Sequence, residues 1–140
     1  MVEFKLNIAD PETGKCVQKA VGEPNSKNFI GMKIGDSVKG ETIDLTGYEF
    51  QITGGSDFCG FPMRKGIQGM RKTILTEGGV GFKGKARYGK RQKGLKVRKT
   101  VCGETVNIKT VQINLKITKK GKANLFEEKK ESAEAPKEKK

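Results

Sequence analysis

Polar and apolar residues alternate along several short stretches of the chain, with the period expected for a β-strand that has one buried face. The pattern predicts strands at residues 2–8 (VEFKLNI), 16–21 (CVQKAV), 48–53 (YEFQIT), 69–77 (GMRKTILTE) and 97–102 (VRKTVC). Between residues 29 and 53, glycines at positions 31, 35, 40 and 47 cut the apolar runs into pieces. Helices do not survive that glycine spacing, so the pieces are also predicted to be β-type.

The clearest β segment is residues 105–118 (TVNIKTVQINLKIT). One face of the predicted strand carries four aliphatic residues: Val111, Ile113, Leu115 and Ile117. Val106 and Ile108 are out of phase with that set. We therefore expect a bulge or register change near Thr110.

These patterns predict an all-β fold, with a small β-barrel-like body, or a sandwich, of short twisted strands. Residues 78–96 contain six glycines and are predicted to form a basic, glycine-rich loop or ribbon. From Lys119 onward the chain becomes charged and poor in apolar residues. We expect a β domain at residues 1–122 and a flexible tail at 123–140 that is partly disordered, or helical with Asn124 as N-cap and Glu127 at the third helical position.

The net charge of +13 is concentrated in one part of the chain. Residues 64–99 hold 13 Lys and Arg and a single acid, Glu77, whereas residues 1–63 carry a net charge of −3. Charge that serves only solubility is expected to mix both signs. The concentration of one sign predicts a polyanionic partner.

The composition argues against an enzyme, a metal site and a cofactor. The chain has no His, and Cys16, Cys59 and Cys102 are not in paired spacing, so we expect three buried thiols and neither zinc nor disulfides. Residues 78–86 (GGVGFKGKA) mimic a phosphate-binding loop, but Gly89 and Gly94 break the helix that such a loop needs. A small enzyme with two carboxylates brought together by folding stays open as a third hypothesis.

The N-terminal residues do not form an apolar leader, and no run approaches a membrane span of about 20 apolar residues. We expect a cytoplasmic protein that is a monomer when free. We predict that the functional site consists of cations that neutralise phosphates and of Tyr88, which can stack on a base. The cations are Arg64, Lys65, Arg71, Lys72, Lys83, Lys85, Arg87, Lys90, Arg91, Lys93, Lys96, Arg98 and Lys99.

The partner is predicted to be RNA, because no basic helix is available for the major groove of DNA, and glycines let a basic ribbon adapt to folded RNA. A general DNA-compacting, chromatin-like protein is the alternative. The basic stretch follows a glycine cluster in which we expect Gly54 and Gly55 to turn the chain with positive φ, and Asp57 to cap nearby amides. Pro62 fixes an extended exit, and Phe58, Phe61 and Met63 are expected to anchor the corner to the body. Direct contact between the backbone of the glycine cluster and RNA remains an alternative to this structural role.

Residues 52–63 (ITGGSDFCGFPM) also resemble the signature of the small-subunit ribosomal protein S6e family of archaea and eukaryotes. Every fixed place of the signature is filled, by Ile52, Thr53, Gly54, Gly55, Asp57, Gly60, Pro62 and Met63. Other segments, such as MKIGDSVKG and VRKTVCG, resemble family segments in the same order, over about residues 1–122.

The resemblance implies a structural constituent of the small ribosomal subunit that supports translation. It implies binding to ribosomal RNA beside neighbouring ribosomal proteins, a β-barrel-type body and no enzymatic role. Eukaryotic members continue into a long basic extension with phosphorylation sites. The short tail here has mixed charge and one serine, Ser132, so the chain is similar to the archaeal short form and we do not carry over that regulation.

Overall fold

The computed structural model describes residues 3–82, 93–121 and 125. It contains seven strands in that part of the chain, and the all-β fold is confirmed. The strands are β1 (Phe4–Ala9), β2 (Cys16–Val21), β3 (Ser37–Lys39), β4 (Glu49–Asp57), β5 (Arg71–Thr76), β6 (Val97–Cys102) and β7 (Thr110–Lys119). Two short 3-10 helices, η1 (Asn25–Phe29) and η2 (Gly40–Ile43), were not predicted. No helix within the described residues is long and apolar enough to cross a membrane.

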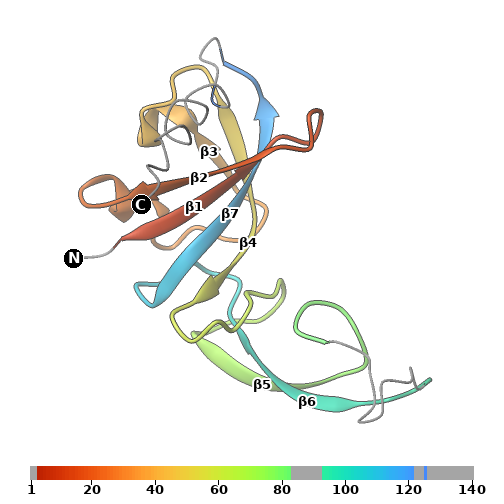
Figure 1. Ribbon diagram of the computed structural model, residues 1–140. Coiled ribbons are helices and arrows are strands. Elements are labelled where there is room, and N and C mark those ends of the chain that lie inside the picture. The colour runs from red at the N-terminus through yellow and green to blue at the C-terminus, as the bar shows by residue number, and fades with distance from the viewer. Residues whose placement is uncertain (1–2, 83–92, 122–124, 126–140) are drawn as a thin grey trace, which may run out of the picture.

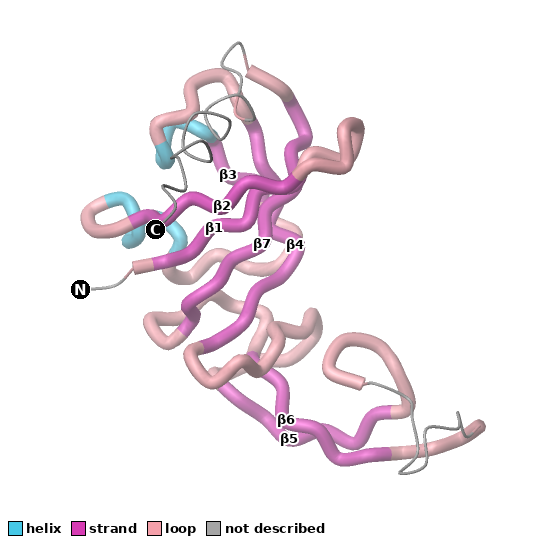
Figure 2. The backbone as a smooth tube through the Cα atoms, in the orientation of Figure 1, coloured by secondary structure: helices cyan, strands magenta, loops and turns pink. Residues whose placement is uncertain are grey.

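The strands form a five-stranded sheet, in the order β2-β1-β7-β4-β3, and a two-stranded ribbon of β5 and β6 (Figure 1). β1 and β7 pair in parallel, and the other neighbours are antiparallel. The sheet is therefore mixed and open, so the expected barrel does not close. Figure 2 shows the β5–β6 ribbon beyond one end of the sheet, with loops between the two.

One face of the sheet is buried. Leu6 of β1 pairs with Ile113 of β7, and both are fully buried, as the alternating pattern predicted. The segment between β2 and β4 covers this face through Phe29 of η1 and Ile43 of η2, which are both 0% exposed. Burying each such side chain stabilises the fold by roughly 1.5–3 kcal/mol. The opposite face of the sheet has no such cover in the described part of the chain.

The segment before β7 differs from the prediction. The strand begins at Thr110, whose hydroxyl accepts a hydrogen bond from Asn107 N (3.1 Å), while Thr110 N donates to Asn107 O (2.9 Å). This turn buries Val106 in the core and leaves Ile108 68% exposed. The irregularity expected near Thr110 is thus present, together with a register shift where β7 pairs with the end of β4. The continuous strand from residue 105 was wrong, because a tight turn satisfies these backbone groups instead.

The end of the chain is described only in part. The predicted tail helix after residue 124 lies outside the described residues. Leu125 is described, is half-buried and packs against the hydrophobic core. A Cβ atom added at Gly121 would lie 2.6 Å from Thr46 O, so the chain is also closely packed where it leaves β7. Gly121 and Leu125, the described residues at this end of the chain, therefore both lie against the body of the protein.

Candidate nucleic-acid interface

Asp57 holds the junction between the sheet and the ribbon. It ends β4, and its side chain is 2% exposed. Its Oδ1 accepts hydrogen bonds from the backbone N–H groups of Cys59 (3.0 Å) and Phe61 (2.9 Å), which is the predicted cap. Its Oδ2 accepts a hydrogen bond from Nε of Arg71 at 2.6 Å. Because Arg71 is the first residue of β5, the same carboxylate shapes the corner, residues 57–62, and holds the start of the ribbon.

The guanidinium of Arg71 is enclosed by aromatic rings as well as by the carboxylate. Its Cζ lies 5.0 Å from the ring centroid of Phe58 and 4.9 Å from that of Phe61, within the range of cation–π attraction. The hydrogen bond to Asp57 raises the pKa of Arg71 above its usual value. Phe58 is 61% exposed, so the prediction that it packs the corner onto the body was wrong, whereas Met63 is 2% exposed and does anchor the corner. Phe61 is half-buried. The aromatic side chains hold a cation and do not fill the core.

Gly54 and Gly55 lie inside β4 and neither has a positive φ, so the predicted glycine turn was wrong at these positions. The turn comes later, where Gly60 has a φ of 80°. Gly55 is needed for a different reason. A Cβ there would lie 2.3 Å from the carbonyl oxygen of Gln112 in β7 and 3.0 Å from Sδ of Met63. The second glycine therefore allows a close backbone approach between two central strands.

The base of the ribbon is bonded to the body at several points. Arg64 N donates to Cys102 O (3.2 Å), and Cys102 N donates to Pro62 O (2.9 Å). Glu104 accepts a hydrogen bond from Gly66 N (2.9 Å) and lies 3.7 Å from Nζ of Lys33. Burial raises the pKa of the Cys102 thiol, which lies 3.1 Å from Met70 O. These contacts fix where the ribbon leaves the sheet.

The expectation of three buried thiols was wrong for two of them, because Cys16 and Cys59 are exposed. Their sequence positions gave no sign of this. Cys16 begins β2, an edge strand that is mostly exposed. Cys59 lies in the turn of the corner, where its N–H is bound but its side chain faces outward.

Arg64 is also engaged within the protein. Its Nη1 donates to Oγ1 of Thr76 (3.1 Å) and lies 3.3 Å from Val80 O. A Cβ at Gly79 would be 3.5 Å from this guanidinium, so the arginine lies against the loop that follows β5. Arg64 and Arg71, both predicted to meet phosphates, are bound to the protein at the two ends of β5.

Most of the remaining predicted cations that the structure describes are exposed and have no acidic partner among the described residues. Five exposed cations have no acidic partner among the described residues: Lys65, Lys72, Lys93, Arg98 and Lys99. Lys96 pairs with Glu77 at 2.8 Å on the surface, where such a pair contributes little stability. The other predicted contacts lie outside the described residues: Lys83, Lys85, Arg87, Tyr88, Lys90 and Arg91.

Strand register places free cations on both faces of the ribbon. Lys72 pairs with Val101, and Lys99 pairs with Ile74, so these two lysines share one face. Arg98 lies opposite Leu75 on the other face, and Leu75 is 63% exposed. The two-stranded ribbon therefore presents exposed cations on both of its faces.

Comparison with known proteins gives a consistent result. A family model described as ribosomal protein S6e matches residues 4–129. The small ribosomal subunit protein eS6 of Archaeoglobus fulgidus is 43% identical over 128 residues, covering 90% of this chain and 95% of the relative. The protein of the same name from Methanocella arvoryzae is 40% identical over 139 residues (95% and 94% covered), and that from Methanothermobacter thermautotrophicus is 43% identical over 125 residues (89% and 93% covered). The chain is thus similar to these relatives over nearly their whole length.

Proposed function

This chain belongs to the ribosomal protein S6e family, and on that premise we propose that it binds small-subunit ribosomal RNA through the β5–β6 ribbon and its adjoining loops. The family is a structural class of the small ribosomal subunit and not a catalytic one. In this proposal the protein joins the subunit in the cytoplasm as a monomer. It then lies beside ribosomal RNA and neighbouring ribosomal proteins.

The segregation of charge carries the proposal. Residues 64–99 hold 13 cations and one acid, and they include β5 and the first half of β6, which form the ribbon that extends away from the sheet in Figure 1. Exposed lysines that lack acidic partners keep their charge available for phosphates. An extended arm also reaches farther into a folded RNA than a flat sheet face does.

The cations divide into two roles. Arg64 and Arg71 are bound to the protein and orient the ribbon, whereas Lys72, Lys99 and their exposed neighbours neutralise phosphates. The corner at residues 57–62 acts as the support that aims the ribbon. This division explains why one carboxylate, Asp57, lies at the edge of a strongly basic segment: it fixes Arg71 and leaves the lysines free.

Co-sedimentation with small ribosomal subunits tests the proposal. We expect the protein to sediment with small subunits at physiological salt and to dissociate as the salt concentration rises, because phosphate contacts release counterions. A protein that stays unbound at low salt would overturn the proposal. Competition with duplex DNA tests the alternative, since equal affinity per phosphate for duplex DNA and ribosomal RNA would indicate a general DNA-compacting protein.

A further inference from the structure

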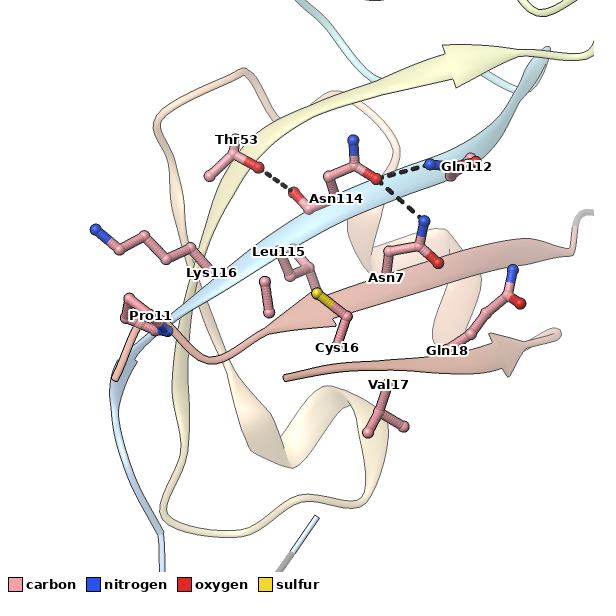
Figure 3. A pocket seen from close by; sticks show the side chains of 11 residues that line it. Asn7, Pro11, Cys16, Val17, Gln18, Thr53, Gln112, Asn114, Leu115 and Lys116 are labelled. Atoms are coloured by element: carbon pink, nitrogen blue, oxygen red, sulfur yellow. Dashed lines mark hydrogen bonds between the residues drawn. The ribbon is translucent and has the colours of Figure 1, made fainter. Parts of the chain in front are cut away.

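The uncovered face of the five-stranded sheet carries a groove (Figure 3), and no residue of β5 or β6 lines it. Side chains from β1, β2, β4 and β7 line it, and six of them are polar: Asn7, Gln18, Thr53, Gln112, Asn114 and Lys116. Among the described residues that line the groove, Lys116 is the only charged one. The other five lining residues are apolar: Ala9, Pro11, Cys16, Val17 and Leu115. The groove is therefore mixed in polarity and carries little charge, which distinguishes it from the basic ribbon on a protein with a net charge of +13.

Strand register builds a row of amides across this groove. Asn7 in β1 pairs with Gln18 in β2 on one side and with Asn114 in β7 on the other. The Oδ1 atom of Asn114 accepts hydrogen bonds from Nε2 of Gln112 (2.8 Å) and Nδ2 of Asn7 (3.4 Å). Thr53 donates to the backbone oxygen of Asn114 at 3.1 Å. These bonds fix the orientation of three amides before any ligand binds.

The fixed orientation leaves donors and acceptors unused. Nδ2 of Asn114, Oδ1 of Asn7 and the whole amide of Gln18 have no hydrogen-bond partner within the part of the chain that the structure describes. Figure 3 shows the hydrogen bonds that join Asn114 to Gln112 and Asn7, with Gln18 beyond Asn7 on the neighbouring strand. A ligand that follows the row would therefore meet both donors and acceptors. Such a mixed set matches hydroxyl groups and base edges, which also donate and accept.

The composition of the groove discriminates between classes of partner. Protein-binding surfaces are enriched in aromatic residues, Met and Arg, and the groove lining has none of these. Single-stranded RNA is usually bound by stacking on aromatic rings, which are also missing from the lining. Lys116 in the groove and exposed Lys5, which pairs with Gln112, add positive charge beside the amides. Neutral hydrogen-bonding groups beside cations complement riboses flanked by phosphates.

We propose that this groove is a second RNA-binding surface, which hydrogen-bonds the ribose 2′-hydroxyls and base edges of double-helical ribosomal RNA. The wide, shallow minor groove of an RNA helix displays both kinds of group. The inference rests on the proposed binding of ribosomal RNA but concerns another face of the protein. The ribbon supplies charge, and the groove supplies contacts that distinguish RNA from DNA.

Salt dependence separates the two surfaces. Replacing both amides in Asn7→Ala/Gln18→Ala removes neutral hydrogen bonds, so the affinity for small-subunit ribosomal RNA should fall roughly tenfold. The slope of log affinity against log salt should not change, because no phosphate contact is lost. The matched control is Asn28→Ala, an exposed amide in η1, which packs on the opposite face of the sheet. An unchanged affinity of the double variant would overturn the inference. A fall in affinity that comes with a shallower salt slope would overturn it too, because the lost contacts would then be phosphate contacts.

Cleavage from a tethered probe tests position without changing the amides. Cys16 lines the groove and is exposed, so an iron chelate can be attached there in a Cys59→Ser background. We expect hydroxyl radicals from Cys16 to cut helical segments of bound ribosomal RNA. The control attaches the chelate to Asn28→Cys after both exposed cysteines are replaced by serine, and it should not cut the same segments. Cys102 is buried, so it does not compete for the label.

The outcomes distinguish failure of this inference from failure of the proposed function. If the labelled protein binds ribosomal RNA in a salt-dependent way but Cys16 directs no cleavage, the groove does not face RNA and only this inference is overturned. Protection of Cys16 from the label in assembled subunits, without cleavage, would assign the groove to a protein neighbour and overturn it too. If the unmodified protein does not bind ribosomal RNA at all, both proposals fail.

Discussion

Gly54 and Gly55 are adjacent in β4, yet alanine should have opposite effects at the two positions. Neither residue has a positive φ, so backbone strain does not distinguish them. A Cβ at Gly54 meets nothing within 4 Å, whereas a Cβ at Gly55 lies 2.3 Å from Gln112 O. An unstrained heavy-atom contact is about 3.5 Å, so Gly55→Ala must push β4 and β7 apart by about 1 Å.

The magnitude follows from what that separation disturbs. Met63 N donates to Gly55 O at 2.9 Å, and Gly55 pairs with Ile113 in the centre of the sheet. Losing or weakening two hydrogen bonds costs about 0.5–1.5 kcal/mol each, and overpacking adds about 1–3 kcal/mol. Gly55→Ala should therefore lower the free energy of unfolding by about 3 kcal/mol. Gly54→Ala should raise it by about 0.5 kcal/mol, because alanine restricts the unfolded chain.

Urea unfolding and thermal melting of the two variants measure this difference. For a domain of this size, about 3 kcal/mol corresponds to a fall in Tm of roughly 12 °C. Gly55→Val should be more destabilising still, because it adds two methyl groups at the same position. If Gly55→Ala melts like the unmodified protein and only its RNA affinity falls, the close-approach argument is refuted and Gly55 is a contact residue.

Three further predictions concern other polar groups. Asp57→Asn should lower the Tm and loosen the start of β5, because an amide donor would then face Nε of Arg71. Faster amide hydrogen exchange in β5 would show the loosening, and unchanged protection of these amides would contradict the prediction. Ser26→Ala should leave the free energy of unfolding unchanged or raise it by up to about 1 kcal/mol in urea titrations, because the buried hydroxyl has no partner among the described residues; a clear loss would reveal a hydrogen bond. The hydrogen bond from Lys120 holds the pKa of Asp10 below its usual value. The ionised Asp10 carboxylate therefore stabilises the folded state in full above the unfolded-state pKa of about 3.9, and this stabilisation is lost as the pH falls through the lower folded-state pKa. Asp10→Asn should therefore be less stable than the unmodified protein at pH 7, with the difference vanishing in acid, and a difference that is constant with pH would refute the assignment.

The strands could be predicted from the sequence where one face of the strand is buried and the other is exposed to solvent. Phe4, Leu6 and Ile8 alternate with exposed or half-buried residues, and so do Ile113 and Leu115. The parallel pairing of β1 with β7, which joins the two ends of the domain, was not predictable, because alternation marks a buried face but not the partner strand. Barrel closure was not predictable for the same reason: the edge strands are β2 and β3, and alternation does not show whether two edge strands pair with each other.

The site was predictable in composition but not in geometry. Counting charges located the basic segment, yet it could not separate Arg71, bound to a carboxylate 14 positions away in sequence, from Lys72 beside it. The glycine pair marked the right place for the wrong reason, since a sequence does not distinguish positive φ from close approach at Gly55. The amide row was missed because Asn7 and Asn114 become neighbours only through the parallel pairing.

The salt dependence of binding tests the ribbon's role most directly. Lys72→Ala/Lys99→Ala removes two exposed cations from one face of the ribbon, and Lys27→Ala/Lys39→Ala removes two exposed cations from the body. Each phosphate contact contributes about 1 to the slope of log affinity for ribosomal RNA against log salt. We predict that the ribbon variant loses about 2 from this slope while the body variant keeps it. Equal slopes for the two variants, or an affinity that barely changes with salt, would contradict RNA binding through the ribbon.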